Sequence, residues 1–112
     1  MDLSDLLHVD GIVPQLRVGS KKQALQELAT RAGAVTGLPE REILETLVQR
    51  ERLGSTGVGH GVAIPHGKLA GLRQIVGLFA RLEKPIDFDS VDGDPVDRCF
   101  CCWRRRIPGR TI

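Results

Sequence analysis

The sequence predicts a single small domain of the α/β class, in which a mixed sheet is flanked by helices. Two segments with apolar residues at helical spacing, about 20–35 and 39–52, alternate with two extended segments, 11–18 and 74–82. This alternation is typical of an α/β sandwich. A chain of 112 residues has room for one such domain with a modest core.

Each predicted helix has its own start signal. Ser20 is a preferred N-cap residue, and apolar residues follow it at positions 24, 25, 28, 29 and 32. Pro39 occupies a first-turn position that proline tolerates, and acidic residues come directly after it. Gly37 lies between the two segments, so we expect two amphipathic helices joined by a short turn. Lys21 and Lys22 are expected on a solvated helix face.

The two extended segments are expected at different places in the sheet. Residues 11–18 alternate in polarity and include a proline, which favours an edge strand. Residues 74–82 are nearly apolar on both faces, as in an interior strand. Residues 84–95 are rich in Asp, Pro and Gly, so we expect a loop there with a short extended piece at 86–88.

Composition excludes several classes of protein. No apolar run approaches the roughly 20 residues of a membrane span, and the first residues lack the features of a secretory signal. We therefore expect a cytoplasmic protein with no membrane insertion. The net charge is +2, but residues 1–97 hold 11 Lys and Arg against 14 Asp and Glu, and five arginines follow. The net positive charge of the chain therefore comes from the residues after 97 alone.

The composition changes abruptly at Asp97. All three cysteines, Cys99, Cys101 and Cys102, lie beyond it together with the single tryptophan. Their C-x-C-C spacing is not a zinc pattern, which pairs C-x₂₋₄-C with a second pair of ligands, so we expect no metal and no cofactor. The sequence therefore predicts a domain at residues 1–97 and an aberrant tail at residues 98–112.

A glycine-rich segment, residues 50–68, lies between the second helix and the interior strand and holds five glycines and two histidines. Glycine lets a ligand or a neighbouring backbone come close, so such a loop can direct several N–H groups at one anion. The segment matches neither nucleotide fingerprint, because it has no G-x-G-x-x-G run and its Gly-Lys pair lacks the spacing of a P-loop. We therefore discount nucleotide binding.

His66 is the candidate nucleophile of this segment. Pro65 is expected to end the apolar run before it and to place the imidazole at a strand end. A neutral imidazole has one nitrogen that can attack phosphorus and a second whose hydrogen bond fixes the tautomer. The product needs donors or cations, and Arg50 is the candidate cation. The residues expected to support the phosphate pocket are Ser55, Thr56 and the loop glycines Gly57, Gly59 and Gly61.

Each of these residues also has a structural interpretation. A lone histidine is most often a core or capping residue, and only the surrounding motif favours a nucleophilic role for His66. For His60, a structural hydrogen-bonding role and a functional role are equally supported. Arg50 and Arg52 lie where cations offset a helix macrodipole, and this interpretation is the better one for Arg52.

Residues 50–67 read RERLGSTGVGHGVAIPHG. This run resembles the phosphorylation motif of enzyme IIA domains of the fructose and mannitol class, which belong to the bacterial phosphoenolpyruvate-dependent phosphotransferase system. The resemblance extends from about Leu3 to Asp97. Residues 3–7, 20–22 and 85–89 fit the nitrogen-regulatory branch of these domains.

The resemblance implies a function. His66 would accept a phosphoryl group from a histidine phosphocarrier protein, Arg50 would balance its charge, and His60 would line the pocket. The acceptor would be a IIB domain or a regulatory target, in sugar uptake or in nitrogen and potassium regulation. Such a protein is a phosphotransferase component with a phosphohistidine intermediate and not a stand-alone turnover enzyme.

The resemblance ends at Asp97, where family members continue with an apolar strand, further helices and a second active-site histidine. If the third base of each codon from Arg98 to Arg104 is joined to the first two bases of the next codon, the new codons encode a leucine-rich run. A frameshift would therefore explain the departure. We therefore expect a sheet that is incomplete at its C-terminus, exposed apolar helix faces, marginal folding and self-association.

Two other functions stay open. The chain can be a regulatory module that binds without being phosphorylated, or a non-functional frameshift product. The five arginines of the tail can contact phosphates, but we expect no nucleic-acid partner, because the tail has the character of translation out of frame.

Overall fold

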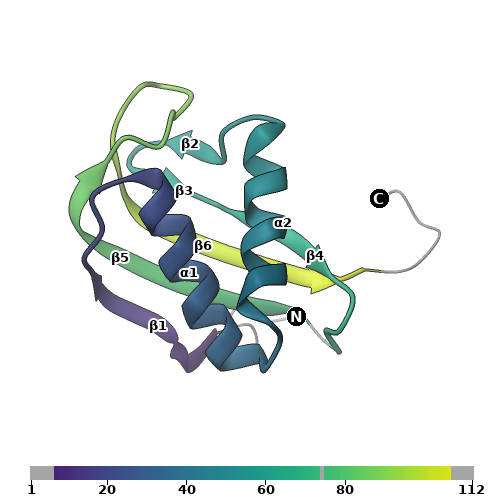
Figure 1. The fold of residues 1–112 in the computed structure, drawn as a ribbon. Coiled ribbons are helices and arrows are strands. Elements are labelled where there is room, and N and C mark those ends of the chain that lie inside the picture. Colours follow the sequence, from purple (N-terminus) through teal and green to yellow (C-terminus); the bar gives the residue numbers. More distant parts are fainter. Residues whose placement is uncertain (1–6, 74, 107–112) are drawn as a thin grey trace.

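Two helices pack side by side on one face of a six-stranded mixed sheet (Figure 1). The structure is a computed structural model, and it describes residues 7–73 and 75–106. It confirms the predicted α/β class. In chain order the elements are β1 (Leu7–Leu16), α1 (Lys21–Thr36), α2 (Glu40–Arg52), β2 (Gly57–Gly59), β3 (Val62–Ala63), β4 (His66–Leu69), β5 (Val76–Ile86) and β6 (Val96–Arg105).

The sheet is built around the antiparallel pair of β5 and β6. Its order is β1-β5-β6-β3-β2, and β4 also pairs with β6. β1 runs parallel to β5, and both β3 and β4 run parallel to β6. The edge strand predicted at 11–18 is confirmed with the bounds 7–16. The interior strand predicted at 74–82 is confirmed with the bounds 76–86, and position 74 lies outside the described residues. β5 continues to Ile86, so the expected loop begins later than residue 84.

Local signals fix the ends of the helices as predicted. The Ser20 hydroxyl accepts a hydrogen bond from the Gln23 N–H at 3.2 Å and caps α1. Gly37 follows α1 with φ 75°, a conformation that glycine adopts without strain, and its N–H bonds to the Gly33 carbonyl at 2.9 Å. The helices face the sheet with fully buried apolar side chains, among them Leu28, Ile43 and Leu47.

The expectation that the interior strand is missing after Asp97 is wrong. Residues Val96–Arg105 form β6, which lies at the centre of the sheet. Cys99, Cys101 and Trp103 are fully buried, whereas Arg98 and Arg104 are exposed, so the segment has the period-two burial of a strand. Aromatic residues fit a pleated surface well, and the unusual composition concealed this alternation. The frameshift itself stays a prediction, which the gene sequence tests.

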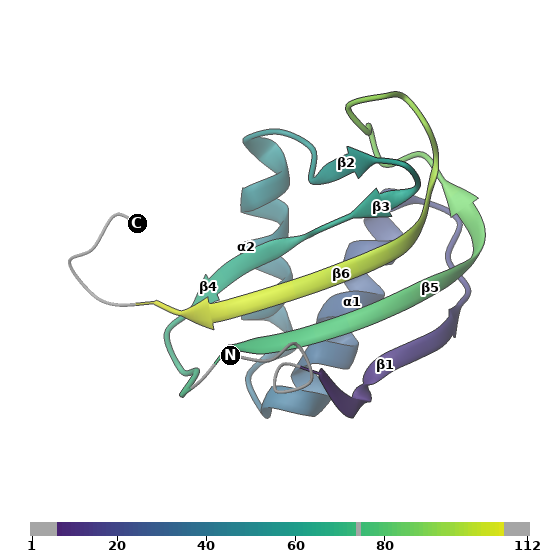
Figure 2. The ribbon, with the colours of Figure 1, turned by 180° about the vertical axis from the view of Figure 1, so that it is seen from behind.

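The predicted exposure of the apolar helix faces is also wrong, because the helices bury them against the sheet. The opposite face of the sheet is different. Among residues 7–73 and 75–106, no helix covers it (Figure 2). Ile12, which pairs with Phe79, is 47% exposed there, and Phe79 pairs in turn with Phe100. An apolar row therefore crosses three strands on the open face.

The contribution of β6 to the core can be measured with Trp103→Ala. The side chain is fully buried, and its indole N–H has no hydrogen-bond partner among the described residues, so it acts through apolar contact. We expect the free energy of unfolding to fall by about 3–5 kcal/mol, measured by urea unfolding followed by circular dichroism. The exposed Arg104→Ala in the same strand is the control. Equal stability of both variants would show that the residues after Asp97 lie outside the core.

The open face predicts association between copies of the chain. We expect light scattering after gel filtration to show a mass above that of the monomer, because an uncovered apolar row favours burial against a second copy. Ile12→Lys places a charge in this row and should shift the population towards monomer. A wild-type chain that is monomeric at all concentrations and melts cooperatively would contradict this expectation.

Candidate functional site

The structure brings Arg50 and His66 into direct contact. His66 is the first residue of β4, and Arg50 lies in the last turn of α2. The Arg50 Nε donates a hydrogen bond to His66 Nε2 at 3.1 Å. Both residues predicted as catalytic therefore meet at one point, although sixteen residues separate them.

Gly67 allows α2 to lie this close to β4. A Cβ atom at this position would lie 2.8 Å from Thr46 Oγ1 and 2.9 Å from Thr46 Cβ, so no larger residue fits without movement of the helix. Trp103 of β6 lies beside the same position. Gly67 was not among the predicted pocket residues, although it immediately follows the candidate nucleophile.

The hydrogen bonds of the His66 ring select its tautomer. Nδ1 lies 2.9 Å from the Ile64 carbonyl oxygen, which can only accept a hydrogen bond, so Nδ1 is assigned the proton. Nε2 then has a free lone pair, in agreement with its position as the acceptor from Arg50. Nε2 is therefore the nitrogen that can attack an electrophile.

The Arg50 guanidinium is held at two points. Its Nη1 donates to the Gly54 carbonyl at 2.8 Å while its Nε contacts the imidazole. A planar guanidinium fixed in this way presents a permanent positive charge beside Nε2. Its place suits the stabilisation of a negatively charged group on that nitrogen.

Ser55 and Thr56 use their hydroxyl groups within the protein. Ser55 Oγ donates to the Phe88 carbonyl at 2.5 Å and accepts from the Gly57 N–H at 3.0 Å. Thr56 is almost fully buried, and both its hydroxyl and its N–H donate to the Glu51 carboxylate. These contacts hold the glycine-rich segment in place.

The glycines of this segment lie against the loop that precedes β6 and against the start of β6. A Cβ atom at Gly57 would lie 2.5 Å from Ser90 Oγ, and one at Gly59 would lie 2.9 Å from Asp92 Oδ2. Gly61 has φ 78°, and a Cβ atom there would lie 3.1 Å from Asp97 Oδ1. The geometry therefore gives all three glycines a packing role. Their predicted support of a phosphate pocket stays a prediction.

The structure does not bring His60 to His66. His60 lies at the exposed tip of the β2–β3 hairpin with φ 56°, and its N–H donates to Asp92 Oδ2 at 3.0 Å. This bond holds the pKa of Asp92 below its ordinary value. Val62, two residues after His60, pairs with Arg98 of β6, whereas His66 pairs with Cys102 of the same strand. Arg98 and Cys102 are four residues apart, which is roughly 13 Å along a strand. The pocket role of His60 stays a prediction from the resemblance.

Lys21 and Glu51 are the residues of this region that the sequence analysis missed. Lys21 was expected on a solvated face, but its Nζ lies 2.8 Å from Glu51 Oε2, and the Glu51 side chain is only 7% exposed. The pairing joins the first turn of α1 to the last turn of α2. Its sequence signal is weak, because 30 positions separate the two residues.

The cysteines of β6 lack the properties of a reactive or metal-binding group. Burial raises the pKa of Cys99 to about 12 and also raises the pKa of Cys101 and Cys102. The thiolate is the nucleophilic and metal-binding form, and it is therefore suppressed at neutral pH. Within the described ranges, no cluster of His, Cys, Asp and Glu suits a metal ion.

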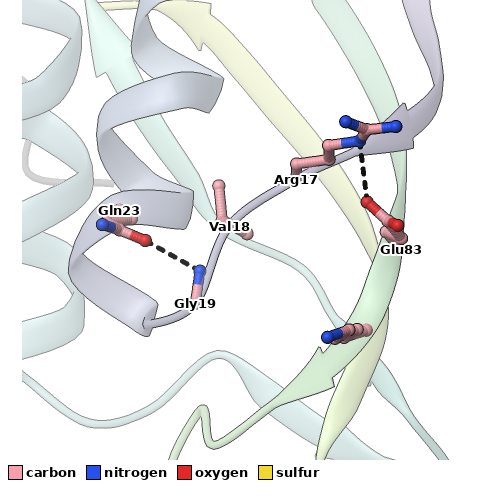
Figure 3. Close-up of a pocket in the computed structure, with 6 residues that line it drawn as sticks. Arg17, Val18, Gly19, Gln23 and Glu83 are labelled. Atoms are coloured by element: carbon pink, nitrogen blue, oxygen red, sulfur yellow. Dashed lines mark hydrogen bonds and ion pairs between the residues drawn. The ribbon is translucent and has the colours of Figure 1, made fainter.

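A shallow pocket lies away from His66, between the end of β1 and the start of α1 (Figure 3). Two pairs of its lining residues bind each other: Arg17 Nε lies 2.9 Å from Glu83 Oε2, and the Gly19 N–H donates to Gln23 Oε1 at 2.7 Å. None of its lining residues contacts His66. In the described part of the chain, no helix is long and apolar enough to cross a membrane.

A sequence model of the family "Phosphoenolpyruvate-dependent sugar phosphotransferase system, EIIA 2" matches residues 5–103. The chain belongs to this family. The match continues six residues beyond Asp97, further than the resemblance found in the sequence. This IIA domain thus contains most of β6 within the matched range.

Known proteins place the IIA domain near the nitrogen-regulatory branch. The nitrogen regulatory protein of Bradyrhizobium diazoefficiens is 60% identical over 100 residues, which are 89% of this chain and 65% of that protein. The crystal structure of the nitrogen regulatory protein IIA-Ntr of Neisseria meningitidis matches with a TM-score of 0.88 and 39% identity, over 95% of this chain and 73% of that one. The chain thus spans slightly less than two thirds of the Bradyrhizobium protein.

A third similarity concerns the fold alone. Enzyme IIA of mannitol from Escherichia coli, solved in complex with phosphorylated enzyme IIB, matches with a TM-score of 0.74 and 19% identity. The match covers 88% of this chain and 70% of that one.

The role of Gly67 in the site can be tested with Gly67→Ala. The added methyl group meets Thr46, so we expect α2 to move from β4 and the free energy of unfolding to fall by about 1–3 kcal/mol. Urea unfolding measures the change. Gly19→Ala is the matched control, because a Cβ atom there makes only an ordinary contact of 3.5 Å. Similar stabilities of the two variants would exclude the close approach described here.

Proposed function

We propose that this IIA domain carries a phosphoryl group on Nε2 of His66, which it receives from a histidine phosphocarrier protein. The observation that carries the proposal is the pair of hydrogen bonds on the imidazole. Nδ1 bonds to the Ile64 carbonyl, and Nε2 faces the Arg50 guanidinium. The ring is thus set in the tautomer and orientation that nucleophilic attack requires.

The transfer exchanges one phosphorus–nitrogen bond for another. The Nε2 lone pair forms a bond to phosphorus while the bond from phosphorus to the donor imidazole breaks, and the donor nitrogen keeps that electron pair. Positive charge develops on the attacking ring and is stabilised through Nδ1–H by the Ile64 carbonyl. The reaction needs no metal or cofactor from this chain.

Arg50 has the task of stabilising the phosphoryl oxygens. In the free protein its Nε donates to Nε2, so this donor must turn to an oxygen when phosphorus occupies the lone pair. The bond from Nη1 to the Gly54 carbonyl keeps the guanidinium beside the site during this change. Catalysis of this kind is positioning together with charge stabilisation.

The partners follow from the family. We infer a cytoplasmic protein whose donor is the histidine phosphocarrier and whose acceptor is a IIB domain or a regulatory target. The similarity to nitrogen regulatory proteins supports the regulatory branch. The Escherichia coli complex of mannitol IIA with phosphorylated IIB illustrates the other type of acceptor.

Phosphorylation can be tested directly. The chain is incubated with phosphoenolpyruvate, the first enzyme of the system and the histidine carrier, and an acid-labile, base-stable adduct is expected. His66→Ala should abolish the adduct. Arg50→Gln should slow its formation by about 10²–10³-fold, because a donor beside the developing charge is lost. His60→Ala separates its two roles: a wild-type rate assigns it to the hairpin, and a slow rate assigns it to the pocket.

One outcome would refute the carrier function. A folded wild-type chain that takes up no phosphoryl group, under conditions in which the Bradyrhizobium relative does, cannot be a carrier. The regulatory module that acts by contact alone, or a non-functional frameshift product, would then be the better description.

A further inference from the structure

We propose that a partly buried network of Lys21, Glu51 and Thr56 positions the His66 ring. The network does not touch the imidazole. It acts through the backbone at residues 54, 56 and 64, and it reaches both ring nitrogens by separate paths of hydrogen bonds and covalent backbone. The proposal rests on the proposed function of His66 and adds Lys21 and Glu51, which neither the sequence motif nor the resemblance assigned to the site.

Glu51 is the centre of the network. Its carboxylate accepts hydrogen bonds from the Thr56 N–H at 3.2 Å and from the Thr56 hydroxyl, and it lies 2.8 Å from Lys21 Nζ. The Glu51 side chain is 7% exposed and that of Lys21 is 21% exposed. A carboxylate withdrawn from water to this degree requires such partners, because an unpaired buried charge is strongly unfavourable.

Lys21 links the network to the loop before β6. Its Nζ lies 4.8 Å from the centre of the Phe88 ring and 3.5 Å from Asp89 Oδ2. Ser55 Oγ donates to the Phe88 carbonyl. The start of α1, the end of α2, the glycine-rich segment and this loop are therefore fixed around one ion pair.

The first path runs to Nδ1. Thr56 is bound to Glu51 through its N–H, and its carbonyl accepts a hydrogen bond from the Ile64 N–H at 2.9 Å. The Ile64 carbonyl in turn accepts the bond from Nδ1–H of His66 at 2.9 Å. Displacement of Thr56 therefore displaces the carbonyl that selects the tautomer.

The second path runs to Nε2. Gly54 lies two residues before Thr56, and its carbonyl accepts from Arg50 Nη1 at 2.8 Å. The Nε of the same guanidinium contacts His66 Nε2 at 3.1 Å. Arg50 and Glu51 are adjacent in the last turn of α2. The Arg50 side chain contacts the imidazole, and the Glu51 side chain contacts Thr56 of the glycine-rich segment.

The two paths matter because His66 itself is exposed, so close packing does not fix its ring. Its orientation depends on the two hydrogen bonds at its nitrogens. Phosphoryl transfer is sensitive to such placement, and an error of about 1 Å can cost roughly 10²-fold in rate. Glu51 is therefore a positioning residue and not a catalytic one.

The test compares Glu51→Gln with Glu83→Gln. Glu83 forms an ion pair of similar length with Arg17, but in the pocket of Figure 3 and without a path to His66. Two readouts are needed: the saturation kinetics of transfer from the phosphorylated histidine carrier, and the ¹⁵N chemical shifts of the His66 ring at alkaline pH. In Glu51→Gln the Thr56 contacts can persist in part, but the charge paired with Lys21 is lost.

We expect Glu51→Gln to lower the maximal transfer rate by about 10–100-fold with little change in the half-saturating concentration of carrier. Its two His66 nitrogen shifts should move towards each other, because the preference for Nδ1–H weakens. Glu83→Gln should keep the wild-type rate within about twofold and the wild-type shifts. A purely stabilising role for Glu51 would leave the tautomer unchanged.

A folded Glu51→Gln chain with wild-type rate and wild-type nitrogen shifts would overturn the proposal. If that variant does not fold, Thr56→Val removes one contact of Glu51 and leaves its ion pair, and the same two readouts apply. The shifts are measured on the unphosphorylated chain. They therefore test the network even if wild type accepts no phosphoryl group, which would refute only the carrier function.

Discussion

The site depends on the close approach of α2 to β4 at Gly67. Because Gly67 has no side chain, Thr46 of α2 packs directly against the backbone of β4, and the end of the helix lies near the start of the strand. Arg50 and His66 occupy these two ends, so their contact follows from backbone packing. Three fully buried residues, Ile43 and Leu47 of α2 and Trp103 of β6, hold the two layers together.

Packing also explains why the glycine-rich segment has its composition. Its glycines leave room for Ser90 and Asp92 of the loop before β6 and for Asp97 at the start of β6. The hydroxyl groups of the segment form hydrogen bonds within the protein. The segment is thus a rigid connection between α2 and the sheet. Among the described residues, Arg50 is the one cation that donates a hydrogen bond to the imidazole, so the proposed function assigns the stabilising positive charge to it.

The sequence predicted the elements whose signals are local. Helical spacing, the Ser20 cap and the apolar run of β5 each depend on neighbouring residues, and the structure confirms them. β6 was missed because its cysteines and arginines concealed a regular alternation of buried and exposed positions. The Arg50–His66 pair was predicted from a motif, whereas Glu51 and Lys21 were not, because contacts between distant segments leave no pattern in one sequence.

The position of β6 has a consequence for how the chain folds. β6 is the last strand of the described residues, yet it pairs with β3, β4 and β5. While the chain is being synthesised, these three strands lack their central partner until β6 has left the ribosome. Pairing between such distant segments is slow, so the nascent chain passes through a stage with unpaired strand edges.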